Sequence, residues 1–169
     1  MNLLTKIFGT TESTQTDSGA TRNPPSQGIS YDSGLVRDLV ADHHKLASYR
    51  NHIEAALSAE DVRAIPGILS EWKLALQTHV MVENVRFYTY LQQHLSGDPD
   101  VSAFLSDLRH EMDGIARALI KFANAYSSVE AMNRAGTARF REDLAEMSAR
   151  LGKRLQAEES RLYTLYIRY

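Results

Sequence analysis

The chain has 169 residues, of which 43% are apolar and 24% charged, so it is long enough for one domain with a buried core. Its formal net charge of -2 gives no electrostatic reason to expect nucleic-acid binding. The sequence has no cysteine, which excludes disulfides, thiolate metal sites and cysteine nucleophiles. Any bound metal must therefore be held by histidine and carboxylate side chains.

The first part of the chain has the composition of a disordered segment. Residues 9–34 are rich in Gly, Ser, Thr and Pro, and we expect residues 1–34 to form a flexible N-terminal tail. The opening MNLLTKIFG is too short an apolar stretch for a signal peptide, and no apolar run approaches the roughly 20 residues that span a bilayer. We therefore expect a cytoplasmic protein without a transmembrane segment.

From Leu35 onward, apolar residues recur with the period of amphipathic helices. The first helix is predicted over about 34–57, and the second from a cap at Ser58 to about 95, with Pro66 as a kink or as its true start. SGDPD at 96–100 is a stop and turn, followed by a third helix to about 126. After a polar link, the fourth is predicted over about 138–166. Residues 35–169 should form an all-α, up-down-up-down four-helix bundle.

Four polar side chains fall on the apolar stripes of the first, second and fourth helices when each position advances by about 100°. They are His43, His79, Glu83 and Glu158. His79 and Glu83 are spaced i, i+4, so they stack on one face of the second helix. A single pair of this kind is weak evidence for a metal, since an inward histidine is more often a hydrogen-bonded core residue.

The third helix offers two candidates at adjacent positions. Its apolar stripe predicts that Glu111 faces inward and that His110 lies nearly opposite, in solvent. His44 lies a full step off the stripe of the first helix and is also expected outside. The residues expected to converge inside the bundle are His43, His79, Glu83, Glu111 and Glu158.

Three carboxylates inside a bundle need cations, because burying an isolated charge is costly. A metal ion is one solution and an arginine is another. Ligand-type residues at matching depth on all four helices favour a present or ancestral metal site over unrelated core residues.

One sequence pattern occurs twice, as HVMVENVRFYT at 79–89 and as RLQAEESRLYT at 154–164. Glu, Arg, Tyr and Thr recur at the same offsets, whereas His79 is replaced by Arg154. The repeat indicates equivalent positions on the second and fourth helices. Tyr88 and Tyr163 are interpreted as core packing at those positions rather than as chemistry.

These residues resemble the hemerythrin-like, or HHE cation-binding, family over residues 35–166. The family pattern is a His on the first helix, His-x-x-x-Glu on the second, a His on the third and His-x-x-x-Glu on the fourth, around a pair of iron ions in a four-helix bundle. On this chain the resemblance implies as metal ligands His43, His79, Glu83, Glu158 and, on the third helix, Glu111 or, less favoured, His110. The chain departs from the pattern at Arg154, where the family has a histidine.

The departure leaves two interpretations open. Arginine stays protonated and cannot ligate, but two imidazoles and three carboxylates could still hold one non-haem iron ion or a carboxylate-rich pair, and would also suit manganese. Alternatively, Arg154, alone or with Arg50 or Arg86, has replaced the metal as the counter-charge, and no metal is bound.

Three functions follow from these interpretations. The first is a non-haem iron protein that binds or senses O2, NO or peroxide, or handles iron. The second is a metal-free bundle that acts as a regulatory module by binding a protein partner. An oxidase-like enzyme ranks last, because the sequence shows no substrate-pocket signature.

Overall fold

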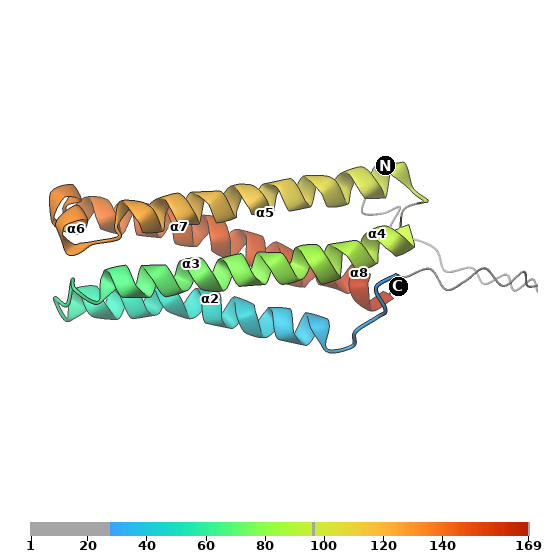
Figure 1. Ribbon diagram of the computed structural model, residues 1–169, viewed down its shortest axis with the longest axis horizontal. Helices are drawn as coiled ribbons and strands as arrows, with labels where there is room; N and C mark the ends of the chain where they lie inside the picture. Colours follow the sequence, from blue (N-terminus) through green and yellow to red (C-terminus); the bar gives the residue numbers. More distant parts are fainter. Residues whose placement is uncertain (1–27, 96, 169) are drawn as a thin grey trace, which may run out of the picture.

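The computed structural model describes residues 28–95 and 97–168, and this part of the chain forms an all-α bundle of four long, antiparallel helical rods (Figure 1). The first rod is α2 (Leu35–Ser58) and the third is α5 (Pro99–Ala125). The second joins α3 (Ile65–Val82), η1 (Glu83–Tyr88) and α4 (Thr89–Leu95). The fourth joins α7 (Thr137–Ala157), η2 (Glu158–Leu162) and α8 (Tyr163–Arg168), after the short α6 (Val129–Ala135). The predicted bundle is confirmed, while the tail at 1–27 lies outside the described residues.

Local sequence signals account for the helix ends. Pro66 lies in the first turn of α3, where a missing N–H costs nothing, so it marks the true start of the second rod. The side chain of Asp98 accepts hydrogen bonds from the N–H groups of Asp100 and Val101 and caps α5. The polar link expected before the fourth helix contains α6, which was not predicted. Gly136, with φ of 84°, separates α6 from α7 in a conformation that glycine adopts readily.

Two segments, η1 and η2, are π-helical, and each begins at the glutamate of the repeated sequence pattern. A π turn adds one residue to the α-helical repeat, and such turns occur frequently at functional sites. Thr89 and Thr164, the last residues of the two repeats, each return a hydroxyl hydrogen bond to a backbone carbonyl, of Asn84 and Arg161 respectively. The repeat therefore coincides with a π-helical segment on both the second and the fourth rod.

The core consists of two apolar clusters on either side of a polar layer. One cluster runs from Leu46 to Leu155 and includes Trp72 and Phe140; the other lies at the α4 and α8 end and includes Phe87. Between them lie five buried polar or charged side chains, which we call the polar layer: His43, His79, Glu83, Arg154 and Glu158. Every rod contributes to both clusters, but only α2, the second rod and the fourth rod contribute to the layer.

The residues just before α2, which fall within the segment expected to be a flexible tail, pack on the bundle. The backbone N–H of Asp32 donates to the Tyr166 hydroxyl at 2.9 Å, and the Asp32 carboxylate pairs with Arg86. The ring of Tyr31 stacks on Tyr166 with centroids 5.2 Å apart. The composition of this segment is polar, but its aromatic and acidic residues have specific partners at the α8 end.

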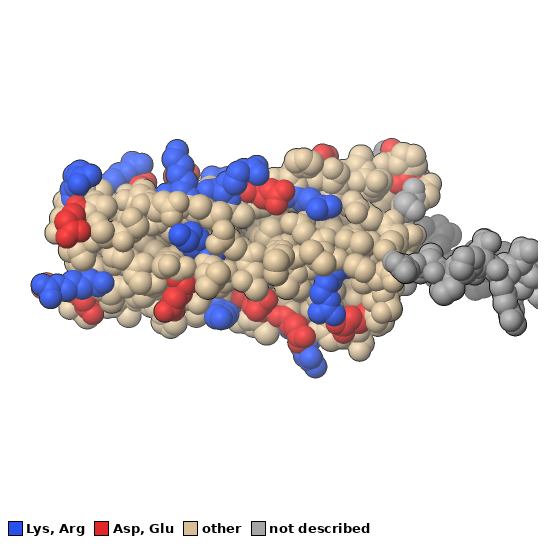
Figure 2. All heavy atoms as spheres, viewed as in Figure 1, with Lys and Arg blue, Asp and Glu red and all other residues tan. Residues whose placement is uncertain are grey.

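The surface carries charges of both signs. In Figure 2, basic and acidic side chains occur along the whole length of the face shown, with mostly uncharged surface between them. Within residues 28–95 and 97–168, no helix has the length and apolar character needed to cross a bilayer.

Candidate metal centre

His43 of α2 contacts carboxylates with both of its ring nitrogens. Its Nε2 lies 3.3 Å from Oε2 of Glu158, a member of the polar layer, and 2.9 Å from the hydroxyl of the buried Tyr163. Its Nδ1 lies 2.7 Å from Oε1 of Glu159, which is partly exposed. A carboxylate behind a histidine fixes the ring and its tautomer, as in most histidine-metal sites.

His79 of α3 has the same orientation with longer contacts. Its Nε2 lies 3.7 Å from Glu83 Oε2, and its Nδ1 lies 3.8 Å from Asp42 Oδ2. Neither nitrogen has a hydrogen-bond partner among the described residues. Burial, followed by the neighbouring charge of His43, lowers the pKa of His79 to about 4, so its imidazole is neutral at physiological pH. A neutral imidazole has a lone pair available for a metal.

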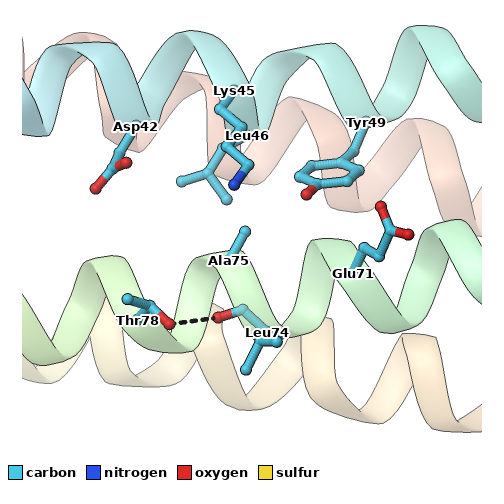
Figure 3. A pocket seen from close by; sticks show the side chains of 8 residues that line it. All are labelled: Asp42, Lys45, Leu46, Tyr49, Glu71, Leu74, Ala75 and Thr78. Carbon is cyan, nitrogen blue, oxygen red and sulfur yellow. Dashed lines mark hydrogen bonds between the residues drawn. The ribbon is translucent and has the colours of Figure 1, made fainter.

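Asp42, the carboxylate on the outer side of His79, can be reached from solvent. Asp42 lies with Thr78 at one end of a groove between α2 and α3, whose other end is lined by Tyr49 and Glu71 (Figure 3). The groove has a volume of about 360 Å³. The imidazole of His79 is therefore buried, while the group behind it lies in an open groove.

The surroundings of Glu83 favour the protonated form of its carboxyl group. Burial and the nearby Glu158 carboxylate raise its pKa from 4.5 to about 8. The Tyr163 hydroxyl donates to Glu83 Oε1 at 2.9 Å, whereas Oε2 has no hydrogen-bond partner in the described part of the chain. Burial and the Glu83 carboxylate raise the pKa of Tyr163 strongly, so this hydroxyl keeps its proton.

Arg154 supplies the positive charge of the layer. Its Nε donates to Glu158 Oε1 at 2.7 Å, its Nη2 to the Tyr88 hydroxyl at 2.9 Å and its Nη1 to Glu111 Oε2 at 3.2 Å. Burial opposes its charge, but Glu158, Tyr88, Glu83 and Glu111 together raise its pKa. Arg50 is exposed and Arg86 pairs with Asp32, so neither joins the layer.

The prediction that Glu111 lies inside the bundle is wrong, since 62% of its side chain is exposed. The buried face of α5 near this point follows Val101, Leu105 and Met112, not Phe104 and Leu108. The true stripe is therefore rotated by about one residue, which moves Glu111 to the flank. His110 and His44 are exposed, as the stripe argument predicted.

Several contacts of the site were missed from sequence. Tyr88 and Tyr163 pack in the core as predicted, through Phe87, but their hydroxyls also reach Arg154 and Glu83. Tyr88 and Tyr163 each lie five residues after the glutamate that begins the π-helical segment. In an α-helix, residues i and i+5 point in different directions, whereas in a π turn they lie on the same side of the helix. The repeated Glu and Tyr were thus the available signal.

Donor atoms of three residues of the polar layer, without Glu83, lie close enough together to hold one metal ion. One ligand atom each from His43, His79 and Glu158 lies within 4.8 Å of the others. Nitrogen and oxygen ligands about 2.1 Å from a four-coordinate ion lie about 3.4 Å apart, close to the 3.3 Å and 3.7 Å histidine–carboxylate distances found here. Glu83 Oε2 and Glu158 Oε2 are buried without hydrogen-bond partners in the described structure. Such orphaned atoms are what a cation would satisfy.

The comparisons agree with this chemistry. The family model for the hemerythrin HHE cation binding domain matches residues 34–166, which is most of the chain. No match was found among curated proteins or among solved structures. Because the family match covers most of the chain and every residue of the polar layer, this chain belongs to the hemerythrin HHE cation-binding domain family.

Proposed function

We propose that this protein binds a single non-haem metal ion, with iron as the first candidate, through His43, His79, Glu83 and Glu158. The observation that carries the proposal is the common orientation of the two imidazoles. Each has Nε2 toward a buried carboxylate and Nδ1 toward a more exposed one. Histidines that serve only as core residues have no need of carboxylates on both sides.

The ligand set favours iron or manganese. It combines two imidazoles with two carboxylates and contains no thiolate, and oxygen-rich sets suit these metals better than soft ones. When bound, such an ion would supply an open position for O2, NO or peroxide. Because the surrounding side chains are buried, only small ligands would reach it.

Arg154 limits the site to one ion. Its guanidinium lies against Glu158 Oε1 and takes the place of the histidine that the family has on the fourth helix. Glu158 would then serve both cations, with Oε1 on the arginine and Oε2 on the metal. Tyr163 keeps its proton and lies between Glu83 and His43, so its hydroxyl would hold Glu83 Oε1 in place beside the metal.

The experiment is an anaerobic Fe(II) titration of purified, chelator-treated protein, followed by metal analysis and an optical spectrum. Wild type should bind a single ion per chain. His79→Ala and Glu158→Ala should each lose tight binding, whereas His44→Ala and His110→Ala, which change exposed histidines, should retain it. Failure of wild type to bind Fe(II) or Mn(II) tightly would refute the proposal.

A second candidate is a metal-free bundle that acts through protein contacts. It is favoured by the Arg154 network, in which Glu158, Glu111 and Tyr88 satisfy the guanidinium without any ion. The network does not reach His79, whose two nitrogens stay without hydrogen-bond partners among the described residues. For that reason the metal site ranks first.

A further inference from the structure

A second cavity, with no histidine in its lining, reaches Arg154. It lies between α5 and the fourth rod and has a volume of about 210 Å³. Its lining consists of Phe104, Leu108, Glu111, Arg154, Ala157, Arg161, Leu162 and Leu165. Most of this wall is apolar, and its charged groups are two guanidiniums and one carboxylate.

The carboxylate of Glu111 occupies a position on the Arg154 guanidinium that another carboxylate could take. Of the three groups bound to the Arg154 guanidinium, Glu158 and Tyr88 are fully buried, whereas 62% of the Glu111 side chain is exposed. An ion pair with so exposed a partner contributes little to stability. Glu111 can therefore move into solvent and leave Nη1 of Arg154 to another carboxylate at small cost.

The second guanidinium is available. Arg161 is exposed at the cavity, and no hydrogen bond or ion pair of its side chain occurs within residues 28–95 and 97–168. Arg86, its counterpart in the other repeat, pairs with Asp32 instead. An arginine that is free, beside a buried one whose outer partner is exchangeable, makes an anion site.

We propose that this cavity binds a small monocarboxylic acid with an apolar body. The carboxylate would replace Glu111 on Arg154 and pair with Arg161, and the body would pack on Phe104, Leu108, Leu162 and Leu165. The volume equals about seven water molecules at roughly 30 Å³ each, which suits an acid of benzoate or hexanoate size. Inorganic phosphate would leave the apolar wall without a partner. The proposal does not depend on a metal in the polar layer.

The test compares benzoate with benzamide, its neutral analogue, by calorimetry or ligand-detected NMR on the full-length, chelator-treated protein. Benzoate should bind at least about tenfold more tightly than benzamide, the ratio that about 1.4 kcal/mol of charge-assisted bonding gives. Phosphate should not compete with it. Hexanoate serves as a second acid of different shape.

Two substitutions change the affinity in opposite directions. Arg161→Gln should weaken benzoate binding about tenfold, and Glu111→Gln should strengthen it, because a competing carboxylate is removed. Arg150→Gln is the matched control, since Arg150 is an exposed arginine of α7 that lines a different groove. The proposal is overturned if neither acid binds at about 10 mM, if benzamide equals benzoate, or if Glu111→Gln fails to strengthen binding.

Discussion

Replacing Arg154 with methionine should destabilise the metal-free protein strongly. The change keeps an unbranched apolar stem in the core but removes the 2.7 Å pair with Glu158, which has no exposed surface. Breaking a buried ion pair from one side costs about 3–5 kcal/mol, because a charge is left buried without a partner. For a chain of this size each kcal/mol shifts the melting temperature by about 2–4 °C, so the expected loss is about 6–20 °C.

The assay is thermal and urea unfolding of chelator-treated Arg154→Met, with Glu111→Gln as control. Glu111 contacts the same guanidinium at 3.2 Å but is largely exposed, so its replacement should cost no more than about 1 kcal/mol. Adding Fe(II) or Mn(II) should restore stability to Arg154→Met, since the ion would take over Glu158. A loss below about 1 kcal/mol in Arg154→Met, or an equal loss in Glu111→Gln, would refute the counter-charge argument.

Three further predictions concern the same layer. Arg154→His should bind Fe(II) more tightly than wild type, and without metal it should be less stable at about pH 8 than at about pH 6, because its imidazole compensates Glu158 only when protonated. In wild type, the raised pKa of Glu83 means that the folded state holds a proton the unfolded state has released, so metal-free stability should fall as pH rises between 4.5 and about 8; Glu83→Gln should flatten that profile in denaturant titrations. Tyr163→Phe leaves Glu83 Oε1 without its donor and should cost about 1–3 kcal/mol by urea unfolding, whereas Tyr31→Phe, at an exposed ring, should be neutral.

The bundle and most of its polar layer were predictable because they follow from periodicity. His43, His79, Glu83 and Glu158 lie on continuous apolar stripes, and stripes fix which residues face inward. The prediction that Glu111 faces inward was wrong for a related reason. The third helix has apolar residues on two adjacent faces, and sequence alone does not say whether Phe104 or Leu105 is the more buried. If the buried face of a helix is assigned wrongly by one residue, the predicted inward and outward positions near it are also wrong.

The π turns could not be predicted from the apolar pattern. They depend on backbone hydrogen bonding, which leaves the stripe on either side intact but shifts its phase by one residue. Tyr163 and Tyr88 thereby turn toward Glu83 and Arg154. The polar composition of residues 28–34 also gave no sign of their packing on the bundle, since their contacts depend on Tyr166 and Arg86, far away in sequence.

The polar layer also bears on how the bundle opens. Among residues 28–95 and 97–168, the buried apolar side chains form two separate clusters with a layer of charges and hydrogen bonds between them, so apolar contacts couple the α4 and α8 end only weakly to the rest. Segments divided in this way can unfold separately while the remaining core stays folded. Amide protons of α4 and α8 would then exchange with solvent through a local opening that leaves α7 protected. An ion shared by α2, α3 and η2 would tie the two clusters together, so that exchange at both ends would require global unfolding.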